Sequence, residues 1–185
     1  LILLCLPMIG FGQYTYIPDN NFEQTLINAG YDNLMDNYAL TSTISNVQNL
    51  NLTTVGNGIN DLTGLEDFTS LTHLTIKSWN ANAVSVQLDL SNHPLLEHLD
   101  IRVGSVLDDL DFSNHLNLEY VRVYPIIFST TSINSINLSN CPNLLNFQFG
   151  SNYSYDLTLN SLDISNCTNL IFSGAGSWSS DQHNL

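Results

Sequence analysis

Four residues of the types that bind zinc recur at one position of a repeated sequence pattern. Each lies three residues after the second apolar residue of a short apolar-x-apolar motif, and they are His93, His115, Cys141 and Cys167. Imidazole and thiolate groups are common zinc ligands. If the motifs form stacked strands, neighbouring members are about 4.8 Å apart and the set spans roughly 14 Å, too far to surround one ion. We therefore interpret them as a structural column at a corner of the fold and expect no metal site.

The two cysteines of this column raise the question of a disulfide. Adjacent stacked positions put the Cα atoms of Cys141 and Cys167 within bonding range. Parallel side chains, however, keep the Cβ atoms about 4.8 Å apart, beyond the usual range of about 3.5–4.5 Å. A disulfide would suit an exported protein. We expect free, buried thiols, with the disulfide as the alternative.

A mostly acidic column occupies the middle of the same motifs, and its members are Asp89, Asp111, Asn137 and Asp163. A serine follows two residues after each of them. Stacked carboxylates repel one another, and bound cations such as calcium would relieve that repulsion. The favoured interpretation is a hydrated acidic face, with calcium binding as the alternative.

All three basic residues of the chain fall in a second series of apolar-x-apolar motifs, at positions that face away from the core. Strand alternation aims Lys77, Arg102 and Tyr124 down one column, and Asp100 and Arg122 down the next. Guanidinium groups bind carboxylates bidentately, and a tyrosine ring offers a surface for a sugar or peptide. These five residues are the predicted ligand-binding site. In the alternative, Asp100 only pairs with Arg122 and Lys77 across neighbouring strands.

Enzyme motifs are missing from the sequence. It contains no Ser-His-Asp order, phosphate-binding loop or HExxH motif. Asp100 with Arg102 could serve a polysaccharide lyase or hydrolase, but a second, facing carboxylate is missing. The net charge of −14 disfavours nucleic-acid and anionic-membrane partners, because both need a positive field. We expect a protein that is not an enzyme and has no cofactor.

The element that must position these residues is a repeat. The stretch LDLSNHPLLEHLDI begins at residue 88, and similar stretches begin at 110, 136 and 162, which are 22, 26 and 26 residues apart. A period of this length is typical of a solenoid, whose coils bury their apolar faces by stacking. Each coil has two short strand arms. Arm A is expected at 50–52, 74–76, 99–101, 121–123 and 147–149, and arm B at 88–90, 110–112, 136–138 and 162–164. We expect the arm A strands to be parallel and adjacent in that order.

Three segments are predicted along the chain. Residues 1–12 read as the remnant of a secretory signal peptide, with a buried first strand as the alternative. Residues 13–43 are predicted to form an N-terminal helical cap. Its helix spans 18–30, with Asn20 and Glu23 at capping-box spacing and Gly30 at the end. Residues 44–185 are predicted to be the solenoid, truncated at the C-terminus, so further repeats or a C-terminal domain are expected beyond it.

The repeats resemble a known family. The pattern L-xx-L-x-L-xx-C-xx-L, carried by Leu159, Leu162, Ile164, Cys167 and Leu170, is similar to the leucine-rich repeat consensus. The runs IPDNNFEQTLINAGYDN and DLTGLEDFTSLTHL resemble the N-terminal cap and first repeats of exported, internalin-like bacterial leucine-rich repeat proteins. The likeness covers residues 14–185.

The resemblance implies a leucine-rich repeat solenoid of the α/β class, with mostly short parallel strands and a short N-terminal capping helix. It further implies secretion or display at the bacterial cell surface, and adhesion through a protein or glycan ligand. No membrane insertion is expected after removal of the signal peptide. Because such solenoids bind very different partners, the fold does not name the ligand. A carbohydrate-active enzyme on a β-solenoid and a structural spacer of a larger surface protein are the alternatives.

Overall fold

The computed structural model describes residues 13–54, 58–78, 88–103, 107–125, 131–150 and 157–172. The elements before the first repeats are β1 (Tyr14–Tyr16), α1 (Asn20–Ala29), β2 (Tyr38–Leu40) and α2 (Thr41–Ile44). They are followed by β3 (Asn49–Thr54), a 3-10 helix (Leu65–Asp67), β4 (His73–Ser78), β5 (His98–Val103), β6 (Leu107–Asp111), β7 (Tyr120–Pro125), β8 (Thr131–Asn137), β9 (Asn146–Phe149), β10 (Leu157–Asp163) and β11 (Ile171–Phe172). No described helix has the length and apolar character needed to cross a membrane.

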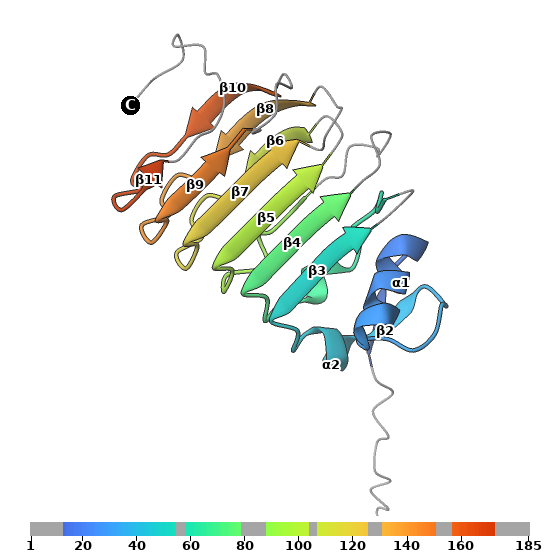
Figure 1. The fold of residues 1–185 in the computed structure, drawn as a ribbon. Coiled ribbons are helices and arrows are strands. Elements are labelled where there is room, and N and C mark those ends of the chain that lie inside the picture. Colours follow the sequence, from blue (N-terminus) through green and yellow to red (C-terminus); the bar gives the residue numbers. More distant parts are fainter. Residues whose placement is uncertain are drawn as a thin grey trace, which may run out of the picture.

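The strands from β3 to β11 form a parallel β-solenoid with two sheets (Figure 1). One sheet has six strands in the order β11-β9-β7-β5-β4-β3, and the other has three in the order β10-β8-β6. All neighbours within these two sheets are parallel. The predicted order and direction of the arm A strands are therefore confirmed.

Arm B differs in part from the prediction. The strands β6, β8 and β10 begin ahead of the motifs expected at 110–112, 136–138 and 162–164. Residues 88–90 were expected to form a strand, but their backbone is irregular. Leu90 is nevertheless buried, so its side chain joins the core although its backbone is not paired in a sheet.

The core consists of apolar ladders that run from coil to coil. On the inner side of the six-stranded sheet, neighbouring strands align one buried residue over the next. The two ladders are Leu50, Leu74, Leu99, Val121 and Phe147, and Leu52, Ile76, Ile101, Val123 and Phe149. Burial of each such side chain contributes on the order of 1.5–3 kcal/mol to the free energy of folding. Stacking of coils is thus the main source of stability, and it forces the alternate residues outward.

Polar side chains fix the turns that follow arm B. The side chains of Asp89, Asp111, Asn137 and Asp163 each accept a hydrogen bond from the backbone N–H two residues later, at 2.9–3.0 Å. That backbone bond, from Ser91 and from Ser165, is the main reason why the pKa values of Asp89 and Asp163 lie below their usual range. The acidic column therefore has a structural role in the turns.

Asparagine occupies the left-handed position of the same turns. Asn114, Asn140 and Asn166 have φ values of 62°, 59° and 62°, a region that asparagine tolerates better than most residues. Their amides also form a ladder, because Asn140 donates to Asn114 at 3.1 Å and Asn166 donates to Asn140 at 2.7 Å. These bonds tie successive coils together at the surface.

The N-terminal elements lie at the β3 end of the solenoid (Figure 1), where β1 and β2 form an antiparallel pair. The helix α1 was expected from its apolar spacing, but its N-cap is Asp19 rather than Asn20. The Asp19 carboxylate accepts hydrogen bonds from the N–H groups of Asn21 and Phe22 at 2.9 and 3.0 Å. Gly30 ends the helix in the left-handed conformation, as predicted.

Glu23 does not complete a capping box. Its side chain is fully buried, and Oε1 accepts hydrogen bonds from the backbone N–H groups of Asp36, Asn37 and Tyr38 at 2.8, 2.5 and 3.2 Å. Glu23 thus holds the loop before β2 against α1. The expectations about the signal peptide at 1–12 and about the truncated end of the solenoid concern segments outside the described residues.

Candidate functional site

The predicted ligand-binding residues lie on one surface, which we call the outward face: the solvent side of β4, β5, β7 and β9. Lys77 aligns with Arg102 and Arg102 with Tyr124, while Asp100 aligns with Arg122. The structure therefore brings all five residues together in the two columns expected from strand alternation. Their role in binding a ligand stays a prediction.

Asp100 is the acidic centre of this face. Arg102 Nη2 lies 3.1 Å from Asp100 Oδ2, and Arg102 Nε donates to Oδ1 at 3.2 Å. Arg122 Nη1 lies 3.7 Å from Asp100 Oδ2. The alternative interpretation paired Asp100 with Arg122 and Lys77. The pair with Arg122 is present, but Arg102 on the same strand takes the place of Lys77. Side chains two residues apart on one strand point to the same side of the sheet. The Arg102 guanidinium therefore reaches both carboxylate oxygens of Asp100.

Arg122 is held between two tyrosine rings. Its Cζ atom is 5.6 Å from the ring centroid of Tyr120 and 5.3 Å from that of Tyr124. Gln148 Oε1 accepts hydrogen bonds from Arg122 Nε at 3.0 Å, from the Tyr120 hydroxyl at 3.1 Å and from the Tyr124 hydroxyl at 3.4 Å. The two rings and the guanidinium are therefore fixed before any ligand arrives, which reduces the entropy lost on binding.

Charge is distributed unevenly over the molecule. The chain carries 17 acidic residues and only three basic ones, and all three basic residues lie on the outward face. One of them, Lys77, forms no ion pair with any described residue. The side chains of Arg102 and Arg122 are 40% and 30% exposed to solvent, so an anion can reach both. The outward face therefore gathers all three cations of the chain around the carboxylate of Asp100.

Sequence reasoning missed a third column on this face. The residue just before each arm A motif also points outward, and the aligned positions include His73, His98 and Tyr120. The imidazoles of His73 and His98 stack with centroids 4.4 Å apart and planes 6° from parallel. Tyr120 continues the stack, 5.8 Å from His98. Strand alternation, applied one residue earlier in each motif, would have found this column.

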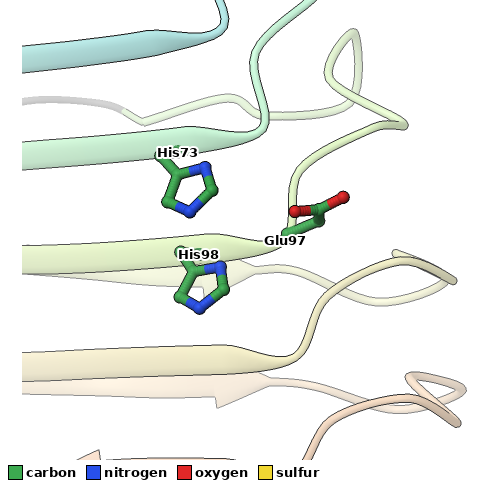
Figure 2. Close-up of side chains that lie close together, drawn as sticks. All are labelled: His73, Glu97 and His98. Carbon is green, nitrogen blue, oxygen red and sulfur yellow. The ribbon is translucent and has the colours of Figure 1, made fainter.

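Glu97 lies beside the two histidines, where the chain enters β5 (Figure 2). The potential ligand atoms of His73, Glu97 and His98 all lie within 4.8 Å of one another. Nδ1 of His98 is buried and has no hydrogen-bond partner among the described groups, whereas His73 Nδ1 is 2.9 Å from the Thr72 hydroxyl. Two imidazoles and a carboxylate are thus assembled at one end of the outward face.

The column expected at a corner of the fold is structural. Each member reaches a backbone carbonyl of the preceding coil. His93 Nε2 is 3.0 Å from Leu65 O, His115 Nε2 is 3.0 Å from Leu90 O, Cys141 Sγ is 3.1 Å from Phe112 O, and Cys167 Sγ is 3.0 Å from Leu138 O. These are four separate contacts, each serving its own coil.

Burial sets the chemistry of this column. It lowers the pKa of His93, raises the pKa of Cys141 to about 11 and also raises that of Cys167. Both thiols are free, which confirms the expectation against a disulfide. Cys141 is buried, whereas Cys167 is only half-buried. Thiols with raised pKa values are poor nucleophiles at neutral pH, so we assign both to packing.

Comparison with known proteins adds no assignment to this geometry. The chain matches no protein family, no characterised protein and no solved structure. Its function is therefore argued from the outward face itself.

Proposed function

We propose that the protein is an exported or cell-surface binding protein of the leucine-rich repeat type, in which α1 caps the solenoid and the outward face recognises a ligand. The repeated motif, the parallel coils and the position of α1 beside β3 support this proposal. Asp100 is engaged by two arginines, so its carboxylate serves the face as a structural anchor rather than as a general base. This favours binding over catalysis.

The observation that carries the proposal is the fixed arrangement of Arg122 between Tyr120 and Tyr124. Tyrosine rings present a flat apolar surface with a polar edge, which suits the faces of a sugar ring. Arginine recognises carboxylates with two parallel hydrogen bonds. Arg102 and Lys77 add positive charge in the neighbouring column. A glycan that carries carboxylates, such as one containing uronic acids, fits both the tyrosine rings and the positive charges of Arg122, Arg102 and Lys77.

A strand face is also a common place for protein recognition, and an acidic, aromatic protein segment would use the same groups. The glycan is favoured because Gln148 accepts hydrogen bonds from both tyrosines and from Arg122, which holds the rings and the guanidinium in place for a ligand with a sugar face and a carboxylate. A protein ligand is the second outcome of the test below.

Replacing Arg102, Arg122 and Tyr124 together with alanine is expected to weaken binding to an acidic glycan by about a hundredfold or more, because arginine and tyrosine dominate interface energetics. Binding would be measured against uronic-acid polysaccharides, their carboxyl-reduced forms and a set of matrix proteins. Carboxyl reduction should abolish the interaction with the wild-type protein, since it removes the groups that arginine recognises.

Tyr14→Ala is the matched control, because it removes an exposed tyrosine from β1, away from the outward face. It should bind like the wild-type protein. The triple variant should keep its fold, since exposed ion pairs contribute at most about 1 kcal/mol each. Undiminished capture by the triple variant would place the binding surface elsewhere, and capture of neither glycans nor proteins would favour a spacer function.

A further inference from the structure

We infer that His73, Glu97 and His98 form a binding site for a divalent transition-metal ion of the zinc class. The inference concerns the end of the outward face where β4 and β5 begin, and it does not depend on glycan binding. No metal site was predicted from the sequence, because only His93, His115 and the two cysteines were considered as zinc ligands.

Backbone geometry explains why the three side chains meet. Parallel pairing aligns His73 on β4 with His98 on β5. At the start of β5 the N–H groups of both Glu97 and His98 donate to Thr72 O, at 2.8 and 3.0 Å. Two successive residues thus share one carbonyl, which brings Glu97 next to the turn that carries His73. The cluster is built by the entrance of β5 rather than by mobile side chains alone.

The donor set selects the ion. Two imidazole nitrogens and one carboxylate oxygen are ligands for zinc and related ions, and three protein ligands leave a position open for water or a ligand. Calcium and magnesium prefer shells made of oxygen, so the histidines disfavour them. Among the histidines of the described residues, His93 and His115 each direct Nε2 at a backbone carbonyl, whereas His73 and His98 lie together on the outward face.

Two observations point to a ligand rather than to a stacked pair alone. His98 Nδ1 is buried without a hydrogen-bond partner among the described groups, and a buried nitrogen of this kind normally has one. The carboxylate of Glu97 lies within 4.8 Å of both imidazoles, where it can neutralise part of an ion's charge. Metal coordination would satisfy the nitrogen and the carboxylate together.

Metal binding requires a small rearrangement. A zinc ion lies about 2.0–2.1 Å from each nitrogen, so tetrahedral ligand nitrogens are roughly 3.3 Å apart. A bound metal also lies in the plane of each imidazole, whereas these planes are 6° from parallel and stacked. At least one ring must therefore turn about its side-chain bonds. Binding should disturb the stack of His73, His98 and Tyr120.

Calorimetric titration of the metal-free full chain with zinc chloride alone tests the inference. We expect one ion per chain at pH 7.5, with calcium and magnesium chloride giving no binding. His98→Gln and His73→Gln should each weaken zinc affinity by about a hundredfold, and Glu97→Gln by about tenfold.

Glu119→Gln is the matched control. Glu119 occupies the position equivalent to Glu97 one coil later, but Tyr120 rather than a histidine follows it. The zinc affinity of the Glu119→Gln variant should stay within about twofold of the wild-type value. Circular dichroism would verify that each variant is folded, and X-ray absorption of the zinc complex should show nitrogen or oxygen ligands at about 2.0–2.1 Å. Unchanged affinity in His73→Gln and His98→Gln, or no zinc binding by the wild-type chain, would overturn the site.

Discussion

Replacing Glu23 with alanine is expected to lower the free energy of unfolding by about 3–5 kcal/mol, because it leaves the N–H groups of Asp36 and Asn37 without their acceptor and a cavity beside them. The Tyr38 N–H keeps a second acceptor, Asp36 Oδ1, at 3.0 Å. The Glu23 carboxylate is fully buried and accepts from Asp36, Asn37 and Tyr38. Alanine removes that acceptor and also opens a cavity beneath the loop. Urea denaturation followed by circular dichroism would measure the loss.

Glu23→Gln is the informative partner of this variant. Glutamine has nearly the same volume and keeps one oxygen that can accept the same N–H groups. Its expected loss is about 1–2 kcal/mol, since a neutral acceptor forms weaker bonds than a carboxylate. If alanine and glutamine destabilised the protein equally, or if alanine cost less than about 1 kcal/mol, the acceptor role of Glu23 would be wrong.

Gly64→Ala is expected to destabilise the protein by about 3–5 kcal/mol, from backbone strain together with overpacking. Gly64 precedes the 3-10 helix and has a φ of 98°, which side chains other than glycine rarely adopt. An added Cβ would also lie 2.7 Å from the backbone oxygen of Tyr16 and would collide with Cδ1 of Ile17. The strand β1 would have to move, and the same denaturation experiment measures the effect.

Gly30→Ala separates the two causes. Gly30 also has a positive φ, of 78°, but an added Cβ would meet nothing within 4 Å. Only the left-handed backbone penalty applies there, so the expected loss is about 1–2 kcal/mol. Equal losses at both glycines would show that the close approach of Gly64 to β1 contributes nothing.

The repeat made the parallel order of the strands predictable. Each coil of a solenoid contacts only its neighbours, so sequence order becomes spatial order. Period-two alternation then predicted that Lys77, Arg102 and Tyr124 would form one column and Asp100 and Arg122 another. These predictions needed only the spacing of apolar residues, and the register of β4, β5 and β7 agrees with them.

Side-chain contacts that depend on rotamers and turns were less predictable. Asn20 and Asp19 are both good N-caps, and the spacing to Glu23 favoured the wrong one because it ignored the loop before β2, whose backbone N–H groups bind the Glu23 carboxylate instead. Arg102 could reach along its own strand as well as across to a neighbour. The alignment of His73 with His98 follows from the same alternation, applied one residue earlier. The place of Glu97 beside them depends on the carbonyl of Thr72 that Glu97 and His98 share, which the spacing of apolar residues does not describe.

Protection of the arginines by a bound ligand tests the outward face most directly. The chain has only two arginines, Arg102 and Arg122, and both are partly exposed there. Phenylglyoxal modification, followed by mass spectrometry, would be compared with and without a saturating acidic glycan. We expect both arginines to react with phenylglyoxal at least about fivefold more slowly when the glycan is bound, because their guanidinium groups then hold its carboxylates. Unchanged modification rates while the glycan stays bound would contradict the outward face as the binding surface.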